Sequence, residues 1–333
     1  MKNILNRLFN RETLSKKEAK EVFINLSEGK YNPSQMAAFM TIYCIRNITV
    51  QELDGFREAM LELCIPINLS SHEYIDLCGT GGDGKDTFNI STLASFVVAG
   101  AGYQVTKHGN YGVSSGCGSS NVMEYLGYHF TNDINQLKKQ LDQSNICFLH
   151  APLFNPAMKI VAPIRKEIGV KTFFNMLGPM VNPAQPNYQL IGVFNLELAR
   201  IYAYLYQTQP TKRYTIIHAL DGYDEVSLTS NIKIYHNHGE KLITPQYFGI
   251  NQKLNPNQIK GGVDVKSSAT IFKNILNGQG SDAQKWVVIS NAALAIQTIL
   301  SNKSIAECYL IAEESLQSKK AKNAFKKLIA SSS

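Results

Sequence analysis

The chain has 333 residues, of which 44% are hydrophobic and 18% charged. This length can bury a full core and favours two packed units, and no stretch is biased enough to predict disorder. The chain has no run of 18 apolar residues, and its N-terminus is too short and polar for a secretory signal, so we expect a cytoplasmic protein without a membrane partner. Six scattered cysteines without a CxxC pair argue against both a disulfide framework and a zinc site.

The net charge of +7 raises the question of nucleic-acid binding, but the lysines and arginines are spread along the chain. The densest cluster is five lysines between Lys319 and Lys327, which we interpret as a solvated face complementing a helix C-terminus. We therefore predict no nucleic-acid partner. An excess of positive charge also suits an anionic small substrate.

Three amphipathic helices are predicted within the first 65 residues. Ser15 to Glu18 and Thr49 to Glu52 read as capping boxes, and Asn32-Pro33 supplies a cap followed by a proline at the first helical position. Apolar side chains recur at helical spacing after each start, and Gly29 and Pro66 end the first and third helices. The chain therefore begins with a small helical unit.

From residue 74 onward, short apolar strands alternate with helices. We expect strands over residues 74–78, 103–107, 146–149, 188–193 and 213–219, and helices over 91–101, 119–126, 134–141, 156–168 and 282–299. This alternation predicts an α/β fold with a mainly parallel central sheet and helices on both faces. Ligands bind outside the carboxyl ends of such strands, so the loops after Cys78, Lys107, Leu149 and Ala219 should converge.

A hairpin is expected over residues 231–244, with its turn near residues 237–240. His236 and His238 would then share one face. Because no third ligand is near, two exposed histidines beside a turn are favoured over a metal pair.

A glycine-rich loop, Gly79 to Gly84, follows the first strand. It fits neither common nucleotide motif, because the dinucleotide fingerprint needs a helix opening inside the motif and the P-loop needs a hydroxyl where Asp86 stands. Glycines let backbone N–H groups approach an anion closely. Residues 89–92 then open a helix with hydroxyls and free amides. We favour phosphate binding over an ordinary glycine turn.

Two further loops carry candidate chemistry. Residues 107–120 supply a cation, an imidazole, an amide and several hydroxyls on a flexible backbone, and long loops of this kind are usually functional. Asp224-Glu225 follows a predicted strand and offers two hard oxygen ligands that suit Mg²⁺. Since Asp221-Gly222 lies beside it, a polar turn fits this acidic doublet about equally well.

Together these loops resemble the signature segments of the anthranilate phosphoribosyltransferases. The matching segments follow the family order along nearly the whole chain: Gly79–Asp83, Asn89–Thr92, Lys107–Asn110, Asn155–Lys159, Val161–Arg165, Phe174–Pro179, Asn182-Pro183 and Asp221–Glu225. The resemblance implies Mg²⁺-dependent transfer of a phosphoribosyl group from phosphoribosyl diphosphate to anthranilate, in tryptophan biosynthesis. It also implies a homodimer.

The fold implied by the resemblance is that of the nucleoside phosphorylases and phosphoribosyltransferases. A helical domain over residues 1–70, joined by a segment near 170–190, would pack on an α/β domain over residues 71–333.

The resemblance also assigns residues to roles. Donor-binding positions are Gly79, Gly82, Asp83, Thr87, Asn89, Ile90, Ser91, Thr92, Lys107 and Ser119. Anthranilate-binding positions are Gly79, His108, Asn110, Asn155, Arg165, Gly178 and Pro179. Ser91, Asp224 and Glu225 match metal-binding positions for two Mg²⁺ ions per subunit. Since the acceptor amine is uncharged at neutral pH, we expect no dominant general base and only a minor role for His108.

Three positions depart from the family pattern. Asn155 stands where most relatives carry histidine, Tyr111-Gly112 where Arg-Ala is common, and Gly116 where a basic residue is common. Asn155 keeps a hydrogen-bonding group but loses the imidazole, which bears on acceptor affinity. The missing basic side chains are expected to weaken donor binding.

Two other functions fit the same fold. A nucleoside phosphorylase would use phosphate and a nucleoside, and its glycine loop has a different composition around the aspartate. A non-catalytic nucleic-acid-binding relative would have lost the acidic doublet and gained a basic groove. The presence of Asp224-Glu225 and the dispersed basic residues argue against the second alternative.

Overall fold

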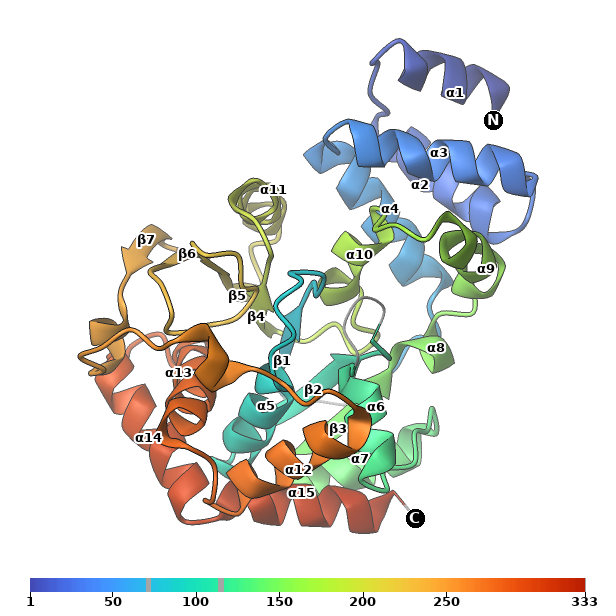
Figure 1. Cartoon of the computed structure of the whole chain (residues 1–333). Coiled ribbons are helices and arrows are strands. Elements are labelled where there is room, and N and C mark those ends of the chain that lie inside the picture. Colours follow the sequence, from blue (N-terminus) through green and yellow to red (C-terminus); the bar gives the residue numbers. More distant parts are fainter. Residues whose placement is uncertain (70–72, 113–116, 333) are drawn as a thin grey trace. The chain divides into compact units, whose positions relative to one another are not determined.

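The computed structural model describes residues 1–69, 73–112 and 117–332, and these residues form two compact units (Figure 1). The helical unit comprises Met1–Ile67 and Ala151–Gln185, and the sheet unit comprises Asn68–His150 and Pro186–Ser333. The segment that returns to the helical unit thus begins at residue 151, earlier than the segment near 170–190 expected from the sequence. Gly116 lies outside the described residues.

The helical unit contains α1 (Lys2–Phe9), α2 (Lys16–Ser27), α3 (Pro33–Ile45), α4 (Val50–Leu63), α8 (Ala151–Phe154), α9 (Met158–Ile168) and α10 (Phe174–Leu177), followed by the 3₁₀ turn η1 (Gly178–Met180). The predicted starts are confirmed: Ser15 and Thr49 form capping boxes and Asn32 accepts from the Gln35 N–H. α1 was missed because it has no side-chain cap and no acidic residue in its first turn.

An aromatic cluster forms the core of the helical unit, and the returning segment supplies part of it. Phe173 stacks on Phe56 of α4 with 4.5 Å between ring centroids, and Phe174 lies 5.4 Å from Phe23 of α2. Phe173 is fully buried. The first 67 residues therefore do not complete their own core.

The sheet unit is built on seven strands: β1 (Tyr74–Gly79), β2 (Gln104–Gly109), β3 (Ile146–His150), β4 (Tyr188–Gly192), β5 (Arg213–Ala219), β6 (Ile232–His236) and β7 (Gly239–Ile243). Their order is β3-β2-β1-β4-β5-β6-β7. The first five strands in this order are parallel, and β6 and β7 add antiparallel edges. The prediction of a mainly parallel sheet is confirmed.

β1 lies at the point where the strand order changes direction. From β1 the chain moves to β2 and β3 on one side and later to β4 and β5 on the other. A switch of this kind leaves an open crevice beyond the carboxyl ends of the two central strands, because their following loops turn apart. The loops after β1 and β4 therefore lie where a ligand is expected.

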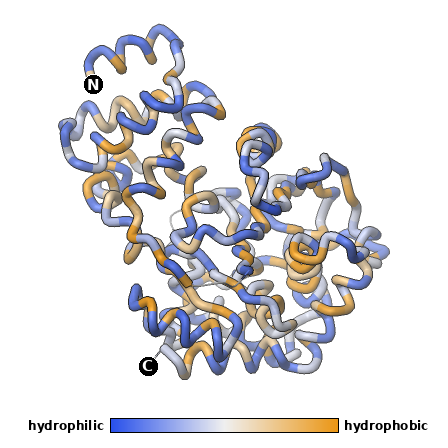
Figure 2. Tube along the Cα trace, turned by 180° about the vertical axis from the view of Figure 1, so that it is seen from behind, coloured by the Kyte–Doolittle hydropathy of each residue, from blue (hydrophilic) through white to orange (hydrophobic). Residues whose placement is uncertain are grey.

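The helices of the sheet unit are α5 (Ile90–Gly100), α6 (Ser119–Tyr125), α7 (Ile134–Ser144), α11 (Leu196–Gln207), α12 (Val265–Leu276), α13 (Asp282–Ile299), α14 (Ile305–Gln317) and α15 (Lys320–Ser331). Two short 3₁₀ turns, η2 (Pro245–Phe248) and η3 (Pro256–Ile259), follow the hairpin. α5 and α13 contact the central strands and each other (Figure 1). Their apolar side chains fill the main core. Along several helices apolar and hydrophilic positions alternate, as helices with one buried face require (Figure 2).

The interpretation of the C-terminal lysines was wrong in one respect. α15 begins at Lys320, after Lys319 with a φ of 65°, and has no basic residue in its last turn, so these lysines lie at the start and in the middle of a helix rather than at its C-terminus. Neither a glycine nor a proline marks the break between α14 and α15 in the sequence, which is why the break was missed. Lys320 pairs instead with Glu314 at 2.9 Å.

The hairpin is confirmed, but His238 lies in its turn rather than on a strand. The backbone N–H of His238 donates to Nδ1 of His236 at 3.1 Å, so the two residues are joined across the turn. Within residues 1–69, 73–112 and 117–332, no helix has the length and apolar character needed to cross a bilayer.

Candidate active site

The loop after β1 takes a conformation that only its composition allows. Gly81, Gly82 and Gly84 have φ values of 63°, 75° and 70°, in the left-handed region that glycine adopts without strain. Helix α5 begins at Ile90, beyond the glycines. The absence of a helix within the motif agrees with the exclusion of a dinucleotide fingerprint.

The acidic doublet after β5 is hydrogen-bonded to this glycine loop. The Gly81 N–H donates to Oδ2 of Asp224 at 2.7 Å, and the Ser91 N–H donates to Oε1 of Glu225 at 3.0 Å. The Thr87 hydroxyl donates to Oε2 of Glu225 at 3.4 Å. Two segments far apart in the sequence thus share one site at the carboxyl edge of the sheet.

Two glycines at the strand ends make room for Asp224. Gly79 and Gly192 are register partners across β1 and β4. A Cβ on Gly79 would lie 2.4 Å from Oδ2 of Asp224, and one on Gly192 would lie 1.5 Å from its carbonyl oxygen. Gly192 was not among the sequence-predicted site residues, although a glycine ending a buried strand signals such a close approach.

The charge at this site is unbalanced. Burial raises the pKa of Asp224 above its usual value, and the neighbouring Asp83 carboxylate raises it further. Burial and the charges of Asp224 and Asp83 likewise raise the pKa of Glu225. Neither member of the doublet forms an ion pair with a lysine or arginine in the described part of the chain. A bound cation would remove this repulsion.

The residues present fit Mg²⁺ shared with a substrate better than a cage made by protein alone. No group of three or more His, Cys, Asp or Glu side chains could hold a metal ion among the residues that the structure describes. Mg²⁺ characteristically takes one or two carboxylates and completes its shell with waters and substrate phosphates. The Asp224-Glu225 doublet beside a glycine loop supplies that partial ligand set.

The loop over residues 107–120 is hydrogen-bonded to the start of α5, the helix that follows the glycine loop. Asn89 Nδ2 donates to the Cys117 carbonyl at 3.3 Å, so the start of α5 is linked to the segment that precedes α6. Ser119 Oγ donates to the Asn110 carbonyl at 3.3 Å. At the end of β2, the buried Lys107 ammonium donates to the His108 carbonyl at 3.0 Å, and the His108 N–H donates to Oδ1 of Asp76 at 3.1 Å.

The remaining candidate residues for binding the phosphoribosyl donor lie at the start of α5 and differ in how exposed their side chains are. Ile90 and Thr92 are buried, whereas Asn89 and Ser91 are partly exposed. Phosphate contacts by Ile90 would therefore involve its backbone.

Tyr111, which stands where arginine is common in the family, is engaged with α6. Its hydroxyl donates to Oε1 of Glu124 at 3.2 Å, and its ring meets His150 edge-on with 4.8 Å between centroids. Nδ1 of His150 is in turn hydrogen-bonded to the Ser120 hydroxyl at 2.9 Å. Tyr111 therefore links the loop over residues 107–120 to α6 and to the end of β3.

The other acceptor candidates lie on the helical unit. Asn155 is buried; its Nδ2 donates to the Ala151 carbonyl, while its Oδ1 has no hydrogen-bond partner among the described residues. Gly178 and Pro179 form the 3₁₀ turn η1. Gly79, His108 and Asn110 belong to the sheet unit, so the predicted acceptor set is divided between the two units.

Arg165 of α9 is a half-buried cation without a carboxylate partner in the described residues. Its Nη2 donates to Oδ1 of Asn175 at 3.4 Å, and its guanidinium lies 5.0 Å from the centre of the Phe174 ring. Burial lowers its pKa. Asn175 was missed as a partner, although it lies inside the Phe174–Pro179 motif.

Comparisons with known proteins agree with this geometry. Residues 71–322 match the family described as glycosyl transferase family, a/b domain, and residues 2–64 match its helical bundle domain. The chain is 62% identical to the anthranilate phosphoribosyltransferase of Flavobacterium psychrophilum over 98% of each chain. The chain belongs to the anthranilate phosphoribosyltransferase family. The enzyme of the same name from Cytophaga hutchinsonii is 51% identical, over 99% of this chain and 100% of that one.

Solved structures of anthranilate phosphoribosyltransferases share the fold. The Thermus thermophilus structure has a TM-score of 0.91 at 30% identity and covers 98% of both chains. The Saccharomyces cerevisiae enzyme in complex with PRPP and Mg has a TM-score of 0.90 at 25% identity, covering 98% of this chain and 96% of that one. The resemblance inferred from the motifs is confirmed, and neither a nucleoside phosphorylase nor a nucleic-acid-binding relative is favoured.

Proposed function

We propose that this protein transfers the phosphoribosyl group of phosphoribosyl diphosphate to the amino group of anthranilate. The products are N-(5-phosphoribosyl)anthranilate and diphosphate, and the reaction belongs to tryptophan biosynthesis. The observation that carries the proposal is the joining of a phosphate-type glycine loop to an unneutralised acidic doublet, through the bonds from Gly81 to Asp224 and from Ser91 to Glu225. Family membership supports the same reaction.

The reaction breaks the bond between the anomeric carbon and the diphosphate oxygen, so its barrier is mainly charge separation. Positive charge develops on the ribosyl ring while negative charge develops on the leaving diphosphate. Backbone amides of a glycine loop and of a helix N-terminus stabilise such an anion in place of water. The donor-binding role is assigned to Gly79, Gly82, Asp83, Thr87, Asn89, Ile90, Ser91, Thr92, Lys107 and Ser119.

Mg²⁺ bound here would neutralise the diphosphate as a Lewis acid. We assign Asp224, Glu225 and the Ser91 hydroxyl as its protein ligands, with two ions per subunit. The raised pKa values of the two buried carboxyl groups, whose repulsion a bound cation would relieve, support this assignment, as does the yeast relative solved with PRPP and Mg. Asp83 orients the donor rather than accepting a proton.

The acceptor-binding role is assigned residue by residue. Arg165 can bind the anthranilate carboxylate through two parallel hydrogen bonds, because its guanidinium has no competing carboxylate among the described residues. The unpaired Oδ1 of Asn155 can accept a hydrogen bond from the amine. We assign anthranilate binding also to His108, Asn110, Gly79, Gly178 and Pro179, as the resemblance implies. The neutral amine attacks without prior deprotonation, so no dominant general base is required.

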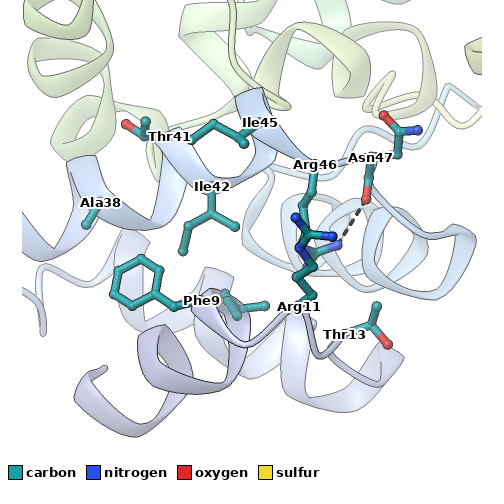
Figure 3. A pocket seen from close by; sticks show the side chains of 10 residues that line it. Phe9, Arg11, Thr13, Ala38, Thr41, Ile42, Ile45, Arg46 and Asn47 are labelled. Atoms are coloured by element: carbon teal, nitrogen blue, oxygen red, sulfur yellow. Dashed lines mark hydrogen bonds between the residues drawn. The ribbon is translucent and has the colours of Figure 1, made fainter.

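A homodimer is the assembly we propose, and the face of α1 and α3 supports it. A pocket of about 830 Å³ opens there, lined by Leu8, Phe9, Arg11, Thr13, Ala38, Thr41, Ile42, Ile45, Arg46 and Asn47 (Figure 3). Phe9 and Ile45 are 62% and 84% exposed. Clustered exposed apolar side chains of this kind mark association surfaces. Ile45→Glu should shift sedimentation from dimer to monomer.

The decisive assay follows the loss of anthranilate fluorescence in the presence of the donor and Mg²⁺. We expect anthranilate to be consumed only when the protein, the donor and Mg²⁺ are all present, with one diphosphate released per anthranilate consumed. Phosphorolysis of a pyrimidine nucleoside without anthranilate turnover would instead identify a nucleoside phosphorylase. Steeply salt-dependent DNA binding without donor binding would indicate the non-catalytic relative.

A further inference from the structure

We propose that Asn291 of α13 is a positioning residue that fixes the acidic doublet for metal binding. Its Oδ1 accepts from the Val226 N–H at 3.1 Å, and its Nδ2 donates to the Val226 carbonyl at 3.0 Å. Val226 is the residue directly after Glu225. The inference rests on the function proposed above, because it concerns the geometry of the same metal-binding loop.

The side chain of Asn291 has every polar group in use. Nδ2 donates its second proton to the Val287 carbonyl at 2.8 Å, one turn earlier in α13. The amide therefore cannot rotate without losing three bonds, and it pairs with Val226 as a neighbouring strand would. Asn291 and Val226 are both almost completely buried, so water cannot replace these bonds.

The location of Asn291 suggests a role beyond packing. Apart from the buried Ser290, α13 is apolar around it, with Val288, Ala292 and Leu294 buried in the main core. Burying an amide in such a helix is unfavourable unless it is hydrogen-bonded, so its presence indicates a specific backbone partner. That partner ends the loop that presents Glu225 to the Ser91 N–H.

The other end of the same loop is held separately. The hydroxyls of Thr229 and Ser230 donate to the Asp221 carboxylate at 2.6 and 2.7 Å. Asp224 and Glu225 therefore lie between two fixed points, Asp221 and Val226. If the Asn291 amide is removed, Val226 loses its side-chain bonds while Asp221 and the strands stay in place.

The test compares Asn291→Leu with a matched variant of the same helix, Thr298→Ala. Leucine has a shape close to that of asparagine and keeps the core filled while removing all three bonds. Thr298 is buried further along α13, where its hydroxyl bonds the Thr215 hydroxyl at 2.7 Å and the Leu294 carbonyl at 2.8 Å, away from the doublet. Both variants lose buried hydrogen bonds, so both are expected to lower the unfolding temperature.

The readouts are the dissociation constant of the donor, measured by calorimetry over a series of Mg²⁺ concentrations, and the Mg²⁺ concentration for half-maximal turnover. We expect Asn291→Leu to raise both about 10- to 100-fold, as loss of a partner that orients metal ligands does. Thr298→Ala should leave both unchanged, and the KM for anthranilate at saturating Mg²⁺ should be unchanged in both variants. Asn291→Ala repeats the measurement if the leucine variant does not fold.

If Asn291→Leu and Asn291→Ala lower the unfolding temperature but keep the wild-type Mg²⁺ dependence, Asn291 is only structural and the inference is wrong. A wild-type protein without Mg²⁺-dependent donor binding would instead overturn the proposed function. The two failures are therefore distinguishable.

Discussion

Gly192 shows how little space surrounds the acidic doublet at the scale of single residues. The carbonyl oxygen of Asp224 occupies the position that a side chain at residue 192 would need, because a Cβ there would lie only 1.5 Å from it. No rotamer change relieves a clash with backbone, so the whole Asp224-Glu225 segment would have to move. Catalysis tolerates such displacements poorly.

We therefore expect Gly192→Ala to lower turnover by about 100-fold or more, the effect of an ångström-scale misplacement of reacting groups. The measurement is anthranilate consumption at saturating donor, with circular dichroism to verify folding. Val193→Ala is the control, because it removes buried atoms from the next residue instead of adding one. Equal activities of Gly192→Ala and the wild type would show that the loop can move without consequence.

A second residue-scale prediction ranks the acidic doublet against His108. The double variant Asp224→Asn/Glu225→Gln removes the proposed metal ligands. It should raise the activation barrier by several kcal/mol and so lower kcat by about 1000-fold. His108→Ala should cost well under the roughly 100-fold expected when a general base is lost. Steady-state kinetics of both variants decide the order, and the reverse order would refute the assignment of roles.

At the scale of elements, the capping box of α4 also joins three parts of the helical unit. The buried Glu52 carboxylate accepts from the Thr49 N–H and hydroxyl at 3.0 Å, from the Leu14 N–H at 3.0 Å and from the Tyr43 hydroxyl at 3.1 Å, and it pairs with Arg46. Burial raises the pKa of Glu52, but these bonds outweigh it and the net pKa lies below the ordinary value of 4.5.

Glu52→Gln should lower the unfolding free energy by about 2–4 kcal/mol at pH 7, because it leaves the half-buried Arg46 guanidinium without its charge partner. Since the folded-state pKa of Glu52 is depressed, its contribution is present above pH 4.5 and declines as the pH falls through the folded-state pKa. Urea denaturation at pH 7 and at pH 4 measures both effects. The exposed capping box offers the control, Glu18→Gln, which should cost less than about 1 kcal/mol.

Helix starts and loops were predicted correctly from the sequence where the capping residues or glycines that form them are close together in the chain. Ser15, Asn32 and Thr49 each cap the helix expected from them, and the glycines after β1 form the loop expected. The close approach of Gly192 to Asp224 and the bonds between Asn291 and Val226 were missed, because they join residues far apart in the chain. The departure at Tyr111 was noticed, but its bond to Glu124 depends on the three-dimensional placement of α6.

At the scale of the whole molecule, the helical unit is assembled from two separate segments. Phe173 and Phe174 of the returning segment stack on each other at 4.4 Å and pack against rings from α2 and α4. Losing buried phenylalanines costs about 3–5 kcal/mol each, which is comparable to the whole stability of a small domain.

Residues 1–67 expressed alone should therefore lack a cooperative thermal transition. A single chain that joins residues 1–67 to 151–185 should regain it, and Phe173→Ala should abolish that gain. Circular dichroism melting curves of the three chains test the prediction. Cooperative unfolding of residues 1–67 alone would mean that the returning segment is dispensable for folding.

The central claim is that the glycine loop and the acidic doublet together hold a Mg²⁺-loaded phosphoribosyl diphosphate. Calorimetric titration of the donor, with and without Mg²⁺, tests it most directly in the wild type and in Asp224→Asn/Glu225→Gln. We expect Mg²⁺ to tighten donor binding in the wild type, and we expect the double variant to lose this dependence. Identical Mg²⁺-dependent binding by both proteins would contradict it.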